Sequence, residues 1–242
     1  MKKYSQVAIV AIAINLLYIS TSYGETVNDF LPQLGNLDIT LKILFLITIL
    51  SLAPAILITV TSFTRIVIIL SLLRHALGTP QTPPNQVIIA LSLFLTLFTM
   101  APTFQQIDEL AIQPYINKKI SDVEAIKRAS EPIKNFMLRN TRKEDLKLFL
   151  DIRNEKPSSP QEISMLTLIP AFMVSEIRTA LEVVFVIFLP FIVIDLLVAS
   201  ILMSMGMMMI PPMMLSLPFK LILFVLSDGW ELLIKSIILS YR

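Results

Sequence analysis

Apolar residues along the chain fall into long blocks, separated by short polar breaks and one long polar stretch. The first block, Ile39 to Leu73, is longer than one membrane span requires, since a helix rises about 1.5 Å per residue. We expect a span near 41–63, followed by a helical extension. A proline-rich string then ends the helix, because proline lacks an amide donor and restricts the preceding residue. A second span is expected from Asn85 to Met100, ending at Pro102.

Residues 103–165 break the apolar pattern and hold 11 of the 20 basic and 10 of the 18 acidic residues of the chain. Apolar residues three and four apart predict helices over Val123 to Met137 and Arg142 to Ile152. The segment Lys156 to Pro160 is typical of a loop, and the next helix is expected to begin directly after it. The pattern therefore predicts a polar, water-exposed helical insert.

The second apolar half predicts another membrane hairpin. Val183 to Met205 forms a span with a single charge, Asp195. Met213 to Leu226 forms a final span that carries Lys220. The remaining residues, Trp230 to Arg242, form a short amphipathic tail with aromatic residues suited to a membrane interface.

The N-terminus resembles an export signal. Lys2 and Lys3 precede an apolar stretch, Val7 to Ile19, that is short for a membrane span. Small residues at Ser22 and Gly24 suit the cleavage site of signal peptidase. The alternative is an uncleaved first anchor. With a cleaved signal, the mature chain begins outside the cytoplasm.

The predicted orientation follows from that start. Arg65 and Arg74 occupy the first turn, which carries no acid and therefore suits the cytoplasmic side. The insert and the C-terminus then lie outside. The basic residues of the insert do not contradict this, because long loops translocate largely regardless of charge. Four spans and an extracytoplasmic insert result.

Composition excludes several classes of function. The chain is 55% apolar and 16% charged, with a mean hydropathy of +0.76, which argues against an ordinary soluble enzyme. It has no Cys and one His, so disulfides, thiolate metal sites and a His-based zinc site are not expected. The net charge of +2 gives no case for nucleic acid. No nucleotide-binding or hydrolase motif is present, so neither catalysis nor a cofactor is expected.

Charges inside the apolar blocks are the first candidate functional residues. An ionisable group at membrane depth costs about 2.5–3.5 kcal/mol on insertion scales and usually has a partner. Asp195 and Lys220 lie at similar distances on either side of a turn, so they are placed to pair within one hairpin or between subunits. Arg178 and Glu182 share a helix face, whereas Glu176 needs another partner. These charges are either structural ion pairs or an ion relay.

Methionines are the second candidate. Seven of the 12 lie between residues 203 and 214, and Met207, Met208 and Met209 are consecutive. Gly206 precedes them and prolines follow, which favours a loop. The residues expected at this turn are Gly206, Pro211 and Pro212. Flexible, polarizable side chains in such a loop are able to seal a pore, although simple lipid-facing packing is the alternative.

Several strings together resemble the FliP family of flagellar and type III secretion export-gate proteins. They occur in family order and cover most of residues 40–235. The strings are LITVTSFTRIVIIL at 57–70, LRHALG at 73–78, TPPNQV at 82–87, PAFMVSEIRTA at 170–180, PFIVID at 190–195, GMMM at 206–209 and PFK at 218–220.

The resemblance implies a subunit of a homo-oligomeric ring, expected to be a homopentamer, in the bacterial inner membrane and flagellar basal body. The ring is expected to assemble with FliQ and FliR homologues, with FlhA and FlhB around it, and to pass unfolded flagellar subunits. In relatives a Met-rich loop forms a gasket, which corresponds here to Met207, Met208 and Met209. Intramembrane charges hold protomers together in relatives. They correspond to Asp195 and Lys220, and less directly to Glu176 and Arg178.

The expected fold is an all-α polytopic membrane protein of helical hairpins with a small helical insert. Two alternatives stay open, a secondary transporter with inverted repeats and a scaffold without a pore. The expected segments are a signal peptide at 1–24, an extracytoplasmic segment at 25–40, a first membrane hairpin at 41–102, the polar insert at 103–165, a second membrane hairpin with the Met-rich loop at 166–226 and the tail at 227–242.

Overall fold

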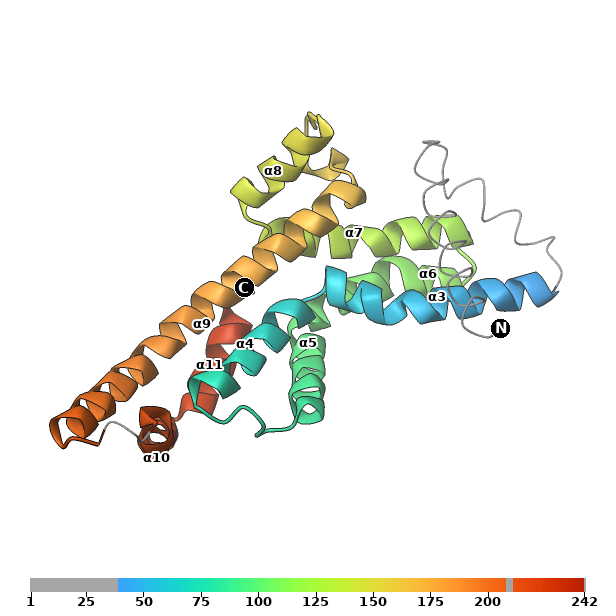
Figure 1. Cartoon of the computed structure of the whole chain (residues 1–242). Coiled ribbons are helices and arrows are strands. Elements are labelled where there is room, and N and C mark those ends of the chain that lie inside the picture. Colours follow the sequence, from blue (N-terminus) through green and yellow to red (C-terminus); the bar gives the residue numbers. More distant parts are fainter. Residues whose placement is uncertain (1–38, 208–210, 242) are drawn as a thin grey trace, which may run out of the picture.

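The computed structural model describes residues 39–207 and 211–241, and every regular element in them is a helix, which confirms the all-α class (Figure 1). The predicted signal peptide, most of the segment 25–40, Met208 and Met209 lie outside the described residues. The elements are α3 (Ile39–Val60), α4 (Phe63–Ala76), α5 (Asn85–Ile107), the π-helix η1 (Asp108–Ile112), α6 (Gln113–Ile116), α7 (Asp122–Asn140), α8 (Lys143–Arg153), the 3-10 helix η2 (Pro160–Glu162), α9 (Met165–Ser204), α10 (Pro212–Leu226) and α11 (Gly229–Leu239).

The first apolar block is bent, which corrects the expectation of one span with a helical extension. The Pro54–Val60 part of α3 meets α4 at an angle of 85°. Hydroxyl groups at the break satisfy backbone groups that a continuous helix would have paired. The Thr64 hydroxyl donates to the Ile58 carbonyl at 2.6 Å, and the Thr61 hydroxyl accepts from the Phe63 amide at 3.3 Å. These bonds pair backbone groups that the sharp turn would otherwise leave without a partner.

The sequence predicted that the next helix ends at Pro102, but the helix continues past this residue. One helical stretch runs from Asn85 to Ile116 through α5, the π-turn η1 and α6, with Pro102 inside it. Proline is tolerated within membrane helices where neighbouring groups satisfy the freed carbonyl. The first part of the predicted insert is therefore a continuation of a long apolar helix.

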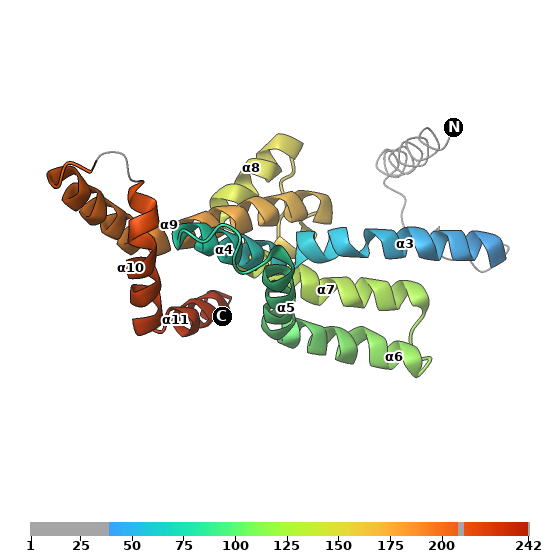
Figure 2. The same ribbon diagram turned by 60° about the horizontal axis from the view of Figure 1, so that its bottom comes forward.

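The 40-residue helix α9 is the axis of the fold. At about 1.5 Å per residue it is about 60 Å long. Pro170 and Pro190 lie inside it without ending it, so the charged residues near position 178 sit within one continuous helix. In Figure 1, α7 and α8 lie at its first half and α10 at its far end, while α4 runs beside it. Figure 2 shows α3, α6 and α7 side by side, extending away from that axis.

Two apolar cores lie along α9. One packs α4, α5, α9, α10 and α11 around residues such as Ile69, Ala180 and Phe224. The other joins the insert to α9 through Phe136, Met137 and Phe172. Phe136 meets Phe172 edge to face, with ring centroids 5.9 Å apart. The insert thus shares its core with the long helix.

The helices supply fewer straight spans than the four that the sequence suggested. By length and composition, two stretches of the described chain suit a membrane crossing, Asn85–Ile116 and Met165–Ser204. The bent pair of α3 and α4 is a third if it counts as one span. Helix α10, at the position of the expected fourth span, has 15 residues, short of the roughly 20 that a crossing needs.

Candidate functional site: buried ion pairs and a methionine turn

Asp195 and the buried Lys220 form an ion pair in the second half of α9. Lys220 Nζ lies 2.6 Å from Asp195 Oδ2, and the Lys220 side chain is 3% exposed. Lys220 Nζ also donates to the carbonyl of Ala76 at 3.3 Å, and the Ser216 hydroxyl donates to Asp195 Oδ1 at 2.5 Å. The pair therefore ties α9 to α10 and satisfies a free carbonyl at the end of α4. Of the two arrangements that the sequence left open, the structure shows the pairing within one chain.

Glu176 is fully buried in the first half of α9, and its partner is Arg65 of α4. The Tyr241 hydroxyl donates to Glu176 Oε2 at 2.5 Å. Arg65 also donates to the Ser240 hydroxyl at 2.9 Å, and its guanidinium carbon lies 4.0 Å from the centre of the Tyr241 ring. Both carboxylate oxygens thus have a donor, as a buried charge requires. We call Arg65, Glu176, Ser240 and Tyr241 the C-terminal cluster.

This cluster brings together two residues that the sequence did not connect. Arg65, expected in the first turn, lies within α4, where it is 3% exposed and paired with an acid. Tyr241, in the predicted amphipathic tail, stacks its ring on Phe136 of the insert, with centroids 5.9 Å apart. No local spacing indicates these contacts, because Arg65 and Glu176 are 111 positions apart and Tyr241 is 65 positions from Glu176.

Arg178 belongs to a separate, exposed network. Its Nε lies 3.5 Å from Glu182 Oε1, in the predicted i,i+4 arrangement. Glu182 is shared with Arg142 of the insert, whose Nη1 donates to Glu182 Oε1 at 2.8 Å. Arg178 Nη1 also lies 3.7 Å from Asp145 of α8. The network therefore connects the insert to α9, a role that the sequence did not suggest for Arg142 or Asp145.

A further carboxylate, Glu155, joins the end of the insert to the start of α9. Its Oε1 accepts from Arg153 Nε at 2.6 Å, and its Oε2 accepts from the Thr167 hydroxyl at 2.8 Å. The hydrogen bond from Arg153, followed by the one from Thr167, lowers the pKa of Glu155 from its ordinary value of 4.5.

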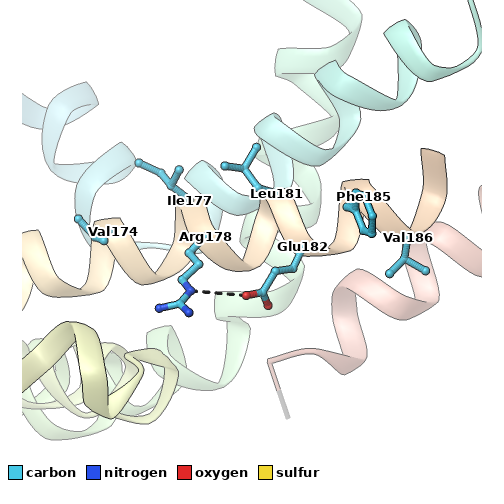
Figure 3. Close-up of a pocket in the computed structure, with 7 residues that line it drawn as sticks. All are labelled: Val174, Ile177, Arg178, Leu181, Glu182, Phe185 and Val186. Carbon is cyan, nitrogen blue, oxygen red and sulfur yellow. Dashed lines mark ion pairs between the residues drawn. The ribbon is translucent and has the colours of Figure 1, made fainter. Parts of the chain in front are cut away.

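The Arg178–Glu182 pair lies within an apolar groove on the outside of α9. Figure 3 shows the two side chains reaching toward each other between apolar neighbours. The groove has a volume of about 670 Å³. Its lining residues are Val174, Ile177, Arg178, Leu181, Glu182, Phe185 and Val186. Phe185 and Val186 are 63% and 64% exposed. An apolar surface with a central ion pair is suited to contact a lipid or another helix.

The methionine turn begins where α9 ends. Gly206 has a φ of +75°, a backbone conformation that residues with a Cβ atom rarely adopt. Its amide donates to the Met203 carbonyl at 3.1 Å, and the Met207 amide donates to the Leu202 carbonyl at 2.9 Å. These two bonds form a Schellman cap, which closes the helix and redirects the chain.

The other side of the turn is set by two prolines. Pro211 is extended, with a ψ of 120°, and Pro212 occupies the first position of α10, where its missing amide donor costs nothing. Gly206, Pro211 and Pro212 therefore lie at the positions where the chain leaves one helix and enters the next. Met207 is 36% exposed.

Within residues 39–207 and 211–241, no group of three or more His, Asp or Glu side chains is arranged to hold a metal ion. The charged side chains described above instead satisfy each other in ion pairs and hydrogen bonds. Their arrangement serves to hold helices together.

Comparison with known proteins gives a consistent result. The family model described as "FliP family" matches residues 46–237. A flagellar biosynthetic protein FliP of Aquifex aeolicus is 56% identical over 86% of this chain and 88% of its own length. The FliP of Bacillus subtilis is 54% identical over 85% of this chain and 94% of its own length. That of Pectobacterium carotovorum is 47% identical over 95% and 92%.

Proposed function

The chain belongs to the FliP family, the flagellar type III export-gate component, and from this premise we propose how it works in the gate. The proposal is that it lines, with partner subunits, the channel through which unfolded flagellar subunits cross the inner membrane. FliP is a structural and transport component and not a known enzyme family. The chain's own task is then to shape and seal a passage, while the energy for export comes from elsewhere.

The outer surface of α9 is the observation that carries this proposal. Only 11% of its most apolar window is buried within the chain. A lone helix this apolar would face lipid all round, but this one also carries an exposed ion pair at its centre. Charged groups at membrane depth usually face protein or water. The surface therefore suits packing against other subunits.

We propose partners on the same basis. Membership of the flagellar export apparatus implies partner proteins in the gate. A homo-oligomeric ring, expected to be a homopentamer, would cover the exposed face of α9. FliQ and FliR homologues would extend the ring, and FlhA and FlhB would surround it on the cytoplasmic side.

The proposed location is the inner membrane at the flagellar basal body, with the insert and the C-terminus on the periplasmic side. The contact between Tyr241 and Phe136 supports placing these two parts together, because it joins the C-terminus to the insert. Arg65 no longer supports the orientation, because it is buried beside the same tyrosine. Arg74 still does, since it lies near the turn between α4 and α5, where it donates to Pro83 and Asn85.

A secondary transporter is the weaker interpretation. Inverted repeats predict a broken helix at corresponding positions of both halves. The first half has the bend between α3 and α4, but α9 continues without a break from Met165 to Ser204. The two halves therefore do not share the feature that this mechanism requires.

The proposed seal consists of Met207, Met208 and Met209. Flexible thioether side chains are able to repack around a passing chain and close again. Replacing all three with Ala is expected to raise the ion conductance of membranes that contain the assembled gate, because the side chains that exclude water are removed. Conductance is measured in bilayers with the purified complex of the chain and co-expressed FliQ and FliR homologues.

The matched control replaces the same three residues with Leu, which keeps most of the apolar volume and should leak far less than the Ala variant. Equal conductance for the wild-type, Ala and Leu complexes, with assembly intact, would contradict the seal.

A further inference from the structure

The helical segments on either side of the bend between α3 and α4 are apolar enough to form one straight membrane helix. The segments Pro54–Val60 and Phe63–Ala76 together pass the length and hydropathy requirements of one span, yet they are bent by 85°. Something beyond composition must therefore hold them bent. Two sets of contacts meet at the break, one local and one from the far end of the chain.

The local set consists of hydroxyl groups. The hydroxyls of Ser62 and Thr99 lie 2.6 Å apart, which ties the break to α5. The Thr61 hydroxyl donates to the Leu57 carbonyl at 2.5 Å, within the last turn of α3. Bonds of this second kind, to a carbonyl four residues earlier, also occur in continuous helices. The Thr64 hydroxyl bond to the Ile58 carbonyl, six residues earlier, does belong to the bent form, but a single hydrogen bond contributes only modestly to stability.

The distant set comes from the last residues of the described chain. Tyr241 donates to Glu176, and its hydroxyl also lies 3.3 Å from the carbonyl of Ser62 at the break itself. Ser240 accepts from Arg65, the third residue of α4. The Tyr241 ring lies between the Arg65 guanidinium and the Phe136 ring of the insert. The C-terminus thus contacts the bend, the long helix and the insert at once.

We propose that Ser240 and Tyr241 form a C-terminal latch that locks the α3–α4 bend against α9 and the insert. The bent form depends on the latch, and in its absence α3 and α4 move toward a straighter arrangement. The latch acts on the conformation of a single subunit and does not depend on the channel proposed above.

The test uses the absence of cysteine from the chain. Leu44→Cys in α3 and His75→Cys in α4 place spin labels at two exposed positions on either side of the bend. A right-angled bend puts their backbones about 33 Å apart, and a straight helix about 46 Å, at about 1.5 Å per residue. Pulsed electron paramagnetic resonance of the full-length chain in lipid nanodiscs reads the distance.

The expected result for the wild-type background is a distribution centred near the shorter distance. Tyr241→Ala, and removal of Ser240 to Arg242, should each shift a large part of the distribution toward the longer one. The matched control is Ser236→Ala in α11, the helix that precedes the latch, which removes an exposed hydroxyl that donates to the Leu232 carbonyl at 2.7 Å. That variant should keep the wild-type distribution.

A distribution that stays at the shorter distance in both latch variants would overturn the proposal, because the local hydroxyls would then suffice. If Tyr241→Ala loses its helical circular dichroism, the double variant Ser240→Ala/Tyr241→Phe is measured in its place. It removes both hydroxyls but keeps the aromatic ring, and it should still add a longer component. A distance distribution of this double variant without a longer component would also overturn the proposal.

Discussion

The ion pairs that Asp195 and Glu176 of α9 form with other helices differ in burial and in the parts of the chain that they join. The Asp195–Lys220 pair joins helices that follow each other in the chain, and the Asp195 side chain is still 33% exposed. The Arg65–Glu176 pair joins distant parts of the chain, and its side chains are 4% and 0% exposed. The first closes a hairpin, whereas the second holds the bend, the long helix and the C-terminus together. Similar chemistry thus serves one local and one global purpose.

The difference predicts the largest effect at Glu176. Glu176→Ala leaves Arg65 charged, buried and without its acidic partner, and removing one member of a buried pair costs about 3–5 kcal/mol. The free energy of unfolding in detergent, measured by denaturant titration, should fall by about that amount. Arg65→Ala should lower the free energy of unfolding by a comparable amount. A change below about 1 kcal/mol in both variants would show that water reaches the cluster.

The effect at Lys220 should be smaller. In Lys220→Ala, Asp195 still accepts a hydrogen bond from the Ser216 hydroxyl. Its carboxylate is also partly exposed and can be hydrated. We expect a loss of about 2–3 kcal/mol in the same titration, below the full cost of breaking a buried pair, because the Asp195 side chain is 33% exposed. Replacing both members, Asp195→Asn with Lys220→Met, should recover part of it because no unpaired charge remains.

A double variant that is less stable than Lys220→Ala alone would contradict this prediction, because the loss would then not come from an unpaired charge on Asp195.

The exposed pair on α9 should matter least to the isolated subunit. Arg178→Ala removes a partner of Glu182, but both side chains are 53% exposed and Glu182 keeps Arg142. Exposed ion pairs contribute little to stability. Unfolding of the single chain should be close to wild type, while any effect should appear in assembly with partners. A loss as large as that of Glu176→Ala would contradict this ranking.

Acid should produce the smallest effect, at the junction of insert and α9. The pKa of Glu155 is lowered by its bonds from Arg153 and Thr167. Its contribution to stability is therefore present above the ordinary value of 4.5 and is lost as the pH falls through the lowered folded value. A Glu155→Gln variant should show a flatter decline of unfolding free energy below that pH than the wild type. Identical acid profiles would argue against the junction.

Sequence reasoning found the local features. The class of the fold, the insert helices and the turn at Gly206 follow from periodicity and from glycine and proline, because these act over a few residues. The Asp195–Lys220 pairing was accessible because a turn places the two residues at similar depth. Even the Arg178–Glu182 contact follows from helical spacing.

The remaining features depend on tertiary structure. The contacts of Arg65 with Glu176 and Tyr241 join α4, α9 and the residues after α11, which lie too far apart in the sequence for any local pattern to predict. Pro102 was taken to end a helix, but its surroundings keep the helix continuous. The bend at Ser62 involves contacts with Thr99 and Tyr241 that apolar patterning does not show. Long-range partners, and not local propensity, decide these positions.

A subunit of an oligomeric gate assembles with copies of itself and with partner proteins, and native mass spectrometry measures both kinds of assembly. The full chain is purified in mild detergent, with and without co-expressed FliQ and FliR homologues. We expect a closed oligomer of the chain, and with co-expression its mass should increase in discrete steps that match the masses of those partners. A monomer or dimer that binds neither partner would contradict it.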